Sequence, residues 1–239
     1  AASRAIALEM GTVAAIDAVD QVDIEAFANN PDIKNINIPF APPVPILFNA
    51  GDESPCADVN FRKAICYALD STAIAEGVAC PAYPVYGFQP NLVDSPKEWR
   101  EGREYYDYNE AKAKEYLEKS GYNGEELTIM YVSSSIAYDG AVILIQSQLG
   151  EVGINVELLR VDQSVNEVYE YEGDKWDMRL DTFGGGDYVV NTLKYFYSEN
   201  LYDTLKGKNP MLVEDAKLDE LFEAMDENPG EETYKAFDE

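Results

Sequence analysis

Histidine is absent from this chain of 239 residues, and cysteine is scarce, at three residues. Without an imidazole, the chain cannot form a Ser-His-Asp or Cys-His catalytic arrangement, a His-ligated zinc site or a His-ligated haem. The cysteines are not spaced as Cys-x-x-Cys and are too few for a four-thiolate zinc site. Cys66 lies in an apolar helical stretch and is expected to be buried, whereas Cys56 and Cys80 could form a disulfide. We expect no metal centre and no cofactor.

Basic residues are also few, because 18 lysines and arginines stand against 45 aspartates and glutamates, for a formal net charge of −27. Such a surface repels nucleic-acid phosphates and anionic lipid headgroups, so we expect no nucleic-acid partner and no direct membrane binding. The same field could attract a cationic ligand, although its simplest consequence is solubility. No apolar run approaches the ~20 residues that span a bilayer, and residues 1–4 do not resemble a signal peptide.

Apolar residues are plentiful, since hydrophobic side chains make up 46% and aromatic side chains 12% of the chain. The clearest pattern is a helix over 109–120, a strand over 127–131, a helix over 141–149 and a strand over 154–158. This succession predicts a βαβ unit with parallel strands and a right-handed crossover, within an α/β fold that has a mixed sheet and flanking helices. The remaining spacing predicts helices over 3–11, 23–29, 164–171, 190–197 and 213–225, two consecutive helices within 58–77, and strands over 33–38, 45–49 and 176–180.

Catalytic motifs are absent from the sequence, which contains no G-x-S-x-G, Walker, G-x-G-x-x-G or EF-hand pattern. The run Gly184-Gly185-Gly186 follows a predicted strand, where glycines either bring backbone N–H groups close to a ligand or form a tight turn. Tyrosines in predicted loops, such as Tyr106 and Tyr188, suit either a ligand surface or packing against the domain.

Several segments, in order along the chain, resemble the family 5 extracellular solute-binding proteins, which are the dipeptide and oligopeptide receptors of ABC importers. The run from Asp58 to Asp70, DVNFRKAICYALD, is similar to the family signature D-V-x-V-R-x-A-x-x-Y-A-x-D. Further matches in the family's order are Leu8–Gly11, Pro45–Asn49, Tyr108–Ala113, Ser120–Tyr122, Gln146–Leu149 and Val152–Val156.

The resemblance implies a receptor with two lobes that close on a ligand. Residues 1–239 would form a single α/β domain, the C-terminal lobe, with residues 1–30 next to the hinge and the N-terminal lobe outside this chain. The ligand would be a peptide or another small solute, and the protein would not be an enzyme. The resemblance also implies an extracytoplasmic protein, either a cell-surface lipoprotein or a periplasmic one. Its partners would be ABC transporter membrane subunits, and a lipid anchor outside this chain would be its only link to the membrane.

The resemblance also points to a ligand site after the strand that contains Trp176. Family members that bind peptides carry a G-W-x-x-D motif there, whose aspartate pairs with the ligand's α-amino group. The run Phe183-Gly184-Gly185-Gly186-Asp187 is similar, with Gly184 where the tryptophan belongs. Asp187 is therefore the predicted partner of an ammonium group, with Phe183, Gly184, Gly185, Gly186 and Tyr188 around it. Asn49, at the end of the strand before the signature, completes the predicted ligand-binding set.

Two other function classes stay open. A carbohydrate-active hydrolase would need two carboxylates at a fixed separation, and among 45 acidic residues such a pair can arise by chance. An acidic cell-surface adhesion module would bind another protein, although no hydrophobic stripe in the sequence marks a surface for it.

Overall fold

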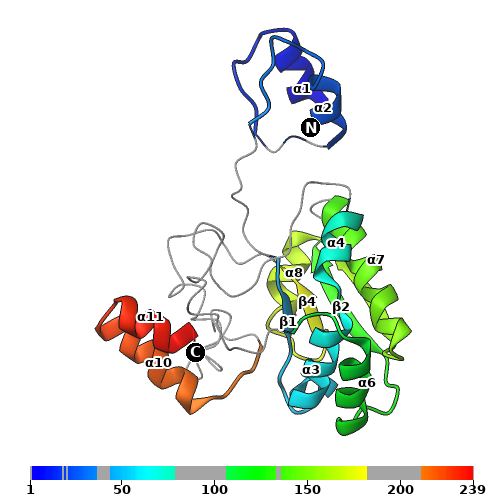
Figure 1. Ribbon diagram of the computed structural model, residues 1–239, viewed down its shortest axis with the longest axis vertical. Helices are drawn as coiled ribbons and strands as arrows, with labels where there is room; N and C mark the ends of the chain where they lie inside the picture. Colours follow the sequence, from blue (N-terminus) through cyan, green and yellow to red (C-terminus); the bar gives the residue numbers. More distant parts are fainter. Residues whose placement is uncertain are drawn as a thin grey trace.

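The computed structural model describes residues 2–17, 19, 21–36, 44–78, 106–132, 136–181 and 211–238. Its centre is a mixed four-stranded sheet with the strand order β1-β4-β2-β3, which confirms the predicted α/β fold class (Figure 1). The strands are β1 (Ile46–Phe48), β2 (Leu127–Val132), β3 (Val156–Val161) and β4 (Met178–Leu180). Strand β1 pairs with β4 in the antiparallel direction, whereas β2 is parallel to both β3 and β4.

The predicted βαβ unit is β2, the helix α7 (Ile136–Glu151) and β3. The two strands pair in parallel from Leu127 opposite Val156 to Val132 opposite Val161. A turn at Gly153, whose φ angle of +90° favours glycine, reverses the chain between α7 and β3. Of the apolar residues whose helical spacing predicted this helix, Ile145 and Leu149 are buried, and Ala141 and Leu144 are partly buried.

Four helices cover one face of the sheet: α3 (Val59–Ala68), α4 (Ser71–Gly77), α6 (Glu110–Lys119) and α7 (Figure 1). Each of the first three begins at a side-chain cap, supplied by Asp58, Asp70 and Asn109. The cap at Asp70 confirms that residues 58–77 form two helices rather than one. The main core lies between these helices and the sheet, and its largest fully buried members include Phe61, Ile65, Tyr67, Leu127, Ile129, Leu149, Ile154 and Met178.

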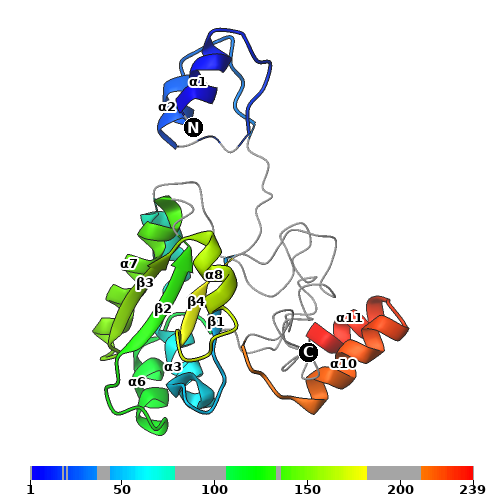
Figure 2. The ribbon, with the colours of Figure 1, turned by 180° about the vertical axis from the view of Figure 1, so that it is seen from behind.

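The other face of the sheet carries the helix α8 (Gln163–Tyr169), which lies in front of the strands in Figure 2. A second buried cluster on this face consists of Leu47, Met130, Val132, Val161, Trp176 and Met211. The backbone N–H of Ala50 donates to the carbonyl of Met211 at 2.8 Å, so the chain around residue 211 is joined to the end of β1.

Two smaller helical segments flank this domain in the sequence. The first contains α1 (Ala2–Glu9) and α2 (Gln21–Phe27), and the second contains α10 (Ala216–Glu227) and α11 (Glu231–Asp238), which contact each other. The prediction of a strand over 33–38 is wrong for residues 33–36, which form no strand, and α11 was not predicted. The predicted helix over 190–197 lies outside the described residues, and the single-domain assignment of residues 1–239, with a segment 1–30 next to the hinge, stays a prediction. Among the described helices, none has the length and apolar character needed to cross a membrane.

Candidate functional site at the carboxyl-terminal edge of the sheet

The three parallel strands β2, β3 and β4 end at the same edge of the sheet. In open α/β sheets, ligands bind in the crevice outside the carboxyl ends of the strands. Polar side chains from the described part of the chain gather at this edge: Tyr131, Asp139, Arg160, Asp162, Asn166, Glu170, Arg179 and Asp181. We call this set the carboxyl-edge cluster.

On the α7 side of the sheet, the cluster contains one exposed ion pair. The Nη2 atom of Arg160 lies 3.1 Å from Oδ2 of Asp139, which stands in the first turn of α7. The other oxygen of that carboxylate, Oδ1, is buried and has no hydrogen-bond partner among the described residues. Burial raises the pKa of Tyr131, and the nearby Asp139 carboxylate raises it further. Tyr131 is therefore a neutral hydroxyl at physiological pH.

On the α8 side, the cluster contains a buried guanidinium group. Arg179 lies in β4 with its side chain only 2% exposed. Its Nη2 atom is 3.0 Å from Oε2 of Glu170 and 2.5 Å from Oδ2 of Asp181, and it also approaches Oδ1 of Asn166 at 3.4 Å. The guanidinium lies over the ring of Trp176, 5.3 Å from its centroid. Two carboxylates thus compensate a single buried positive charge, as a buried ion requires.

Helix α8 begins at the same edge because Asp162 directly follows β3. Its Oδ1 atom accepts hydrogen bonds from the hydroxyl of Ser164 at 2.7 Å and from the backbone N–H of Val165 at 3.0 Å. These bonds lower the pKa of Asp162 by stabilising its charged form. The cap fixes the start of α8. The helix then places the side chains of Asn166 and Glu170 within hydrogen-bond distance of Arg179.

Most of the predicted ligand-binding residues lie outside the described part of the chain, namely Phe183, Gly184, Gly185, Gly186, Asp187 and Tyr188. The strand that leads to them is present, however, and it ends at Leu180 on the carboxyl-terminal edge. Only Thr182 separates the predicted segment from Asp181, a member of the cluster. Its contact with a ligand stays a prediction.

Asn49 lies at the opposite edge of the sheet, because β1 runs antiparallel to β4. The side chain is buried, at 2% exposure. Its Nδ2 atom donates to the carbonyls of Gly173 at 2.8 Å and Trp176 at 3.0 Å, and its Oδ1 accepts from the N–H of Gly51 at 3.0 Å. Asn49 therefore closes the turn that precedes β4, and the structure does not bring it to the carboxyl-edge cluster. Its predicted contact with a ligand is not tested by this geometry.

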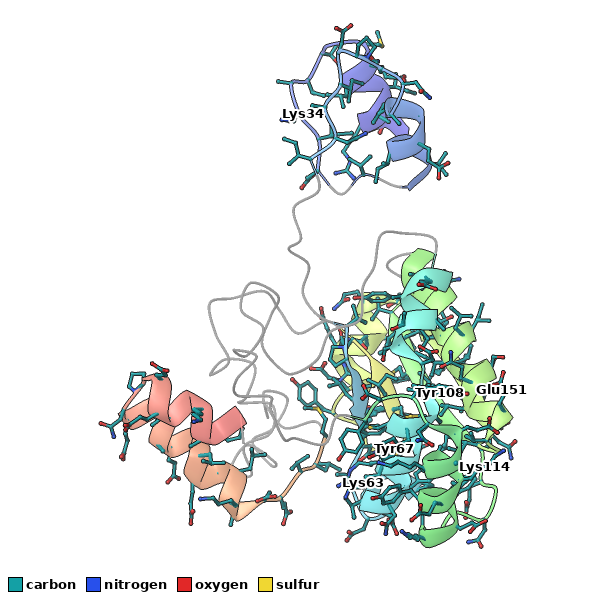
Figure 3. The ribbon with its side chains drawn as sticks, in the orientation of Figure 1. Lys34, Lys63, Tyr67, Tyr108, Lys114 and Glu151 are labelled. Carbon is teal, nitrogen blue, oxygen red and sulfur yellow. The ribbon has the colours of Figure 1, made fainter. Side chains whose placement is uncertain are left out.

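The structure describes two of the three cysteines and one of the two loop tyrosines named from the sequence. Cys56 and Cys66 are free thiols. Cys56 is fully buried, whereas Cys66, which was expected to be buried, is only partly so, and Cys80 lies outside the described residues. Tyr106 packs edge-on against Tyr67, with ring centroids 5.2 Å apart. Tyr67 and Lys63 lie on α3 beside α6, the helix that carries Lys114 (Figure 3).

Sequence reasoning missed Arg179, Glu170 and Asn166. The alternation of Met178 and Leu180 placed Arg179 on the face away from the predicted core, and such a face is commonly solvated in a sheet. One sequence signal could have indicated that Arg179 is buried. The helix predicted directly before the strand can cover the second face of the sheet, and in the structure α8 and the buried Trp176 do lie on that face.

Comparison with known proteins agrees with this fold. The family model described as bacterial extracellular solute-binding proteins, family 5 Middle, matches residues 1–202. The solved structure of the ABC transporter substrate binding protein CtaP from Listeria monocytogenes is similar, with a TM-score of 0.78, 20% identity, and coverage of 99% of this chain and 48% of CtaP. No curated protein matches the chain.

Two further solved structures share the fold. The protein AgaA from A. tumefaciens R10, in complex with agropinic acid, has a TM-score of 0.76 at 23% identity, with 99% of this chain and 48% of AgaA covered. The oligopeptide-binding protein AppA from Bacillus subtilis, in complex with a nonapeptide, has a TM-score of 0.70 at 20% identity, with 99% and 49% covered. The chain thus spans about half the length of the solved structures that it matches.

Proposed function

Because the chain belongs to family 5 of the bacterial extracellular solute-binding proteins, we propose that it forms one lobe of a receptor that captures a small solute outside the cytoplasm and delivers it to an ABC importer. The observation that carries the proposal is the match of the family model to residues 1–202. The parallel strands with a charged carboxyl-terminal edge support it, since that edge is where an α/β lobe meets a ligand.

The mechanism that we propose is closure of two lobes around the ligand. A ligand that contacts both lobes binds the closed state better than the open one, and so shifts the population toward closure. Closure excludes water, which strengthens a charged hydrogen bond between the Asp187 carboxylate and a ligand ammonium group. One lobe alone offers half of these contacts, so this chain by itself binds the ligand weakly.

A peptide is the ligand class that we favour. The aspartate at position 187 suits a free amino terminus, and AppA from Bacillus subtilis was solved in complex with a nonapeptide. AgaA, solved in complex with agropinic acid, supports another small solute as the second candidate. Delivery requires the membrane subunits of an ABC transporter as partner, and places the protein in the periplasm or, through a lipid anchor, on the cell surface.

A receptor of this kind returns its ligand unchanged, so the protein is not an enzyme under this proposal. Neither the family match nor the solved relatives support the hydrolase or the adhesion module that the sequence left open. Incubation of the full-length protein with peptides and oligosaccharides, followed by mass spectrometry, distinguishes these classes, because turnover of either substrate contradicts a receptor.

The ligand-binding step is tested by calorimetric titration of short peptides into the full-length receptor and into this chain. We expect tight binding only by the full-length receptor. Replacement of Asp187 by Ala should weaken binding of peptides with a free amino terminus by about tenfold or more, since a charge-assisted hydrogen bond is lost.

N-acetylated versions of the same peptides are the matched control. They lack the ammonium group, so they should bind the receptor weakly and should not distinguish Asp187→Ala from the original sequence. Tight binding by the isolated chain contradicts the two-lobe mechanism. If Asp187→Ala binds the free peptides as tightly as the original receptor does, Asp187 does not have the role assigned to it.

A further inference from the structure

Arg179 occupies a position that an apolar side chain could fill. It is buried on the second face of the sheet, beside a cluster that consists of Leu47, Met130, Val132, Val161, Trp176 and Met211. Its Nε atom is buried and finds no hydrogen-bond partner within the described ranges, which is unfavourable for the folded state. Buried ion pairs can often be replaced by apolar residues of similar volume with no loss of stability. Core stability alone therefore does not explain an arginine at this position.

The contacts of the guanidinium suggest what it does instead. Its Nη2 atom bonds to Glu170, the first residue after α8, and to Asp181, the first residue after β4. The two carboxylates are largely shielded from water, with side chains 18% and 25% exposed. Charged hydrogen bonds in such an environment are stronger and more directional than those at the surface. Arg179 thus ties the residue after α8 to the residue after β4, and the latter lies at the carboxyl-terminal edge.

We propose that Arg179 is a positioning residue, which anchors the end of β4 to the end of α8 and so sets the direction in which the chain leaves the sheet at Asp181. This proposal rests on the proposed function, because the chain beyond Asp181 carries the predicted ligand-binding segment. The bond to Asp181 acts on the last described residue before that segment, and the bond to Glu170 connects it to a helix that is fixed by its own cap at Asp162.

Hydrogen exchange followed by mass spectrometry tests the anchor directly, without any ligand. In Arg179→Met, backbone amides in fragments that span residues 170–181 should exchange at least tenfold faster than in the original chain. Glu170→Gln breaks the charged bond on the helix side without creating a cavity. It should change exchange in the same direction by a smaller factor, and it keeps the test valid if Arg179→Met does not fold.

Arg62→Met is the matched control for loss of an arginine. Arg62 lies in α3 and donates from Nη1 to the carbonyls of Cys56 at 2.7 Å and Ala57 at 2.9 Å, and none of these residues belongs to the carboxyl-edge cluster. It should leave exchange in residues 170–181 within twofold of the original. If Arg62→Met accelerates exchange there as much as Arg179→Met does, or if the Arg179 and Glu170 variants stay within twofold of the original, the anchor is refuted.

Binding of trialanine to the full-length receptor provides the functional measurement. Arg179→Met should weaken it at least tenfold and Arg179→Lys by less, since a lysine keeps the positive charge and its hydrogen-bond donors but lacks the planar guanidinium. Equal affinity of Arg179→Met and the original refutes a positioning role. If the original receptor does not bind trialanine, that result counts against the peptide proposal, and hydrogen exchange alone decides the anchor.

Discussion

The thiols of Cys56 and Cys66 show how burial controls the chemistry of single residues. Burial raises the pKa of Cys56 to about 12, and the nearby Asp177 carboxylate adds to the effect. Burial also raises the pKa of Cys66 to about 11. A raised pKa lowers the fraction of thiolate, which is the reactive form. At pH 8 this fraction is ~0.1% for a pKa of 11, against roughly a quarter for an ordinary thiol.

We therefore predict that neither thiol reacts with a disulfide reagent such as DTNB while the chain is folded. Because Cys80 lies outside the described residues, the measurement is made on Cys80→Ser. Native protein at pH 8 should release no chromophore within minutes, and protein in 8 M urea should release two equivalents. Rapid release of one equivalent from the native variant would contradict the raised pKa of one of these thiols.

Arg179 shows the limit of single-residue patterns. Its neighbours Met178 and Leu180 alternate as a strand should, and both are buried in the main core as predicted. The alternation alone does not reveal whether the opposite face of the strand is solvated or covered, because that depends on α8 and on the distant residue Met211. The burial of Arg179 therefore depends on tertiary contacts. The residues next to it in the sequence do not predict the site to which it belongs.

At the scale of elements, helices and strands were predicted well where the sequence shows both the apolar spacing of the element and a residue that begins or ends it. Helix α6 has an asparagine cap and a glycine shortly after its end, and the apolar positions that predicted β2 and α7 include the buried residues Leu127, Ile129, Ile145 and Leu149. The strand expected over 33–38 contains three isoleucines, but residues 33–36, the described part of it, form no strand. Among the described strands none pairs with residues 33–36, and Asn35 instead donates to the carbonyl of Ile24 at 3.5 Å. A β-strand is stable only when it pairs with another strand, and the local sequence pattern does not show whether such a strand is present.

Asn49 links two elements, since it follows β1 and bonds to the turn before β4. Replacement by Ala leaves the carbonyls of Gly173 and Trp176 without this donor and the N–H of Gly51 without its acceptor. We expect the free energy of unfolding to fall by about 2–4 kcal/mol, because unsatisfied buried groups are expensive. Urea unfolding measures this loss.

Asn155→Ala is the control for that experiment. Its Nδ2 atom donates to the carbonyl of Gly124 at 3.1 Å in an exposed turn, where water can replace the lost bond. It should cost less than about 1 kcal/mol. If both variants lose the same stability, the buried hydrogen bonds of Asn49 do not hold the turn before β4.

At the scale of the whole molecule, the family was identifiable from the order of several weak motifs, none of which is specific alone. The motif from Asp58 to Asp70 is accounted for by structure: Asp58 and Asp70 are helix caps, and Phe61, Ala64 and Ala68 are buried. Residues that maintain a fold thus identify a family whose ligands differ, as agropinic acid and a nonapeptide do in two solved relatives. Under the proposed function, the ligand depends on the segment after β4 and on contacts made by a second lobe.

The net charge of −27 also acts on the molecule as a whole. Repulsion among acidic side chains opposes the compact state, and dissolved salt screens it, with a Debye length of about 30 Å at 0.01 M and about 8 Å at 0.15 M. Salt also weakens ion pairs, but most of those in the described residues are exposed, such as Lys114–Glu110 and Lys119–Glu115, and exposed pairs contribute little. Relief of repulsion should therefore dominate.

We predict that the thermal unfolding midpoint rises when sodium chloride is increased from 0.01 M to 0.15 M at pH 7. A gain of about 1 kcal/mol corresponds to ~2–4 °C for a chain of this size. Calorimetry measures the midpoint, and tetramethylammonium chloride at the same ionic strength is the control, because it screens charge without offering a small cation for a specific site. Equal shifts in both salts indicate screening of the whole surface. A midpoint that falls with salt would instead mean that ion pairs outweigh the repulsion among the acidic side chains.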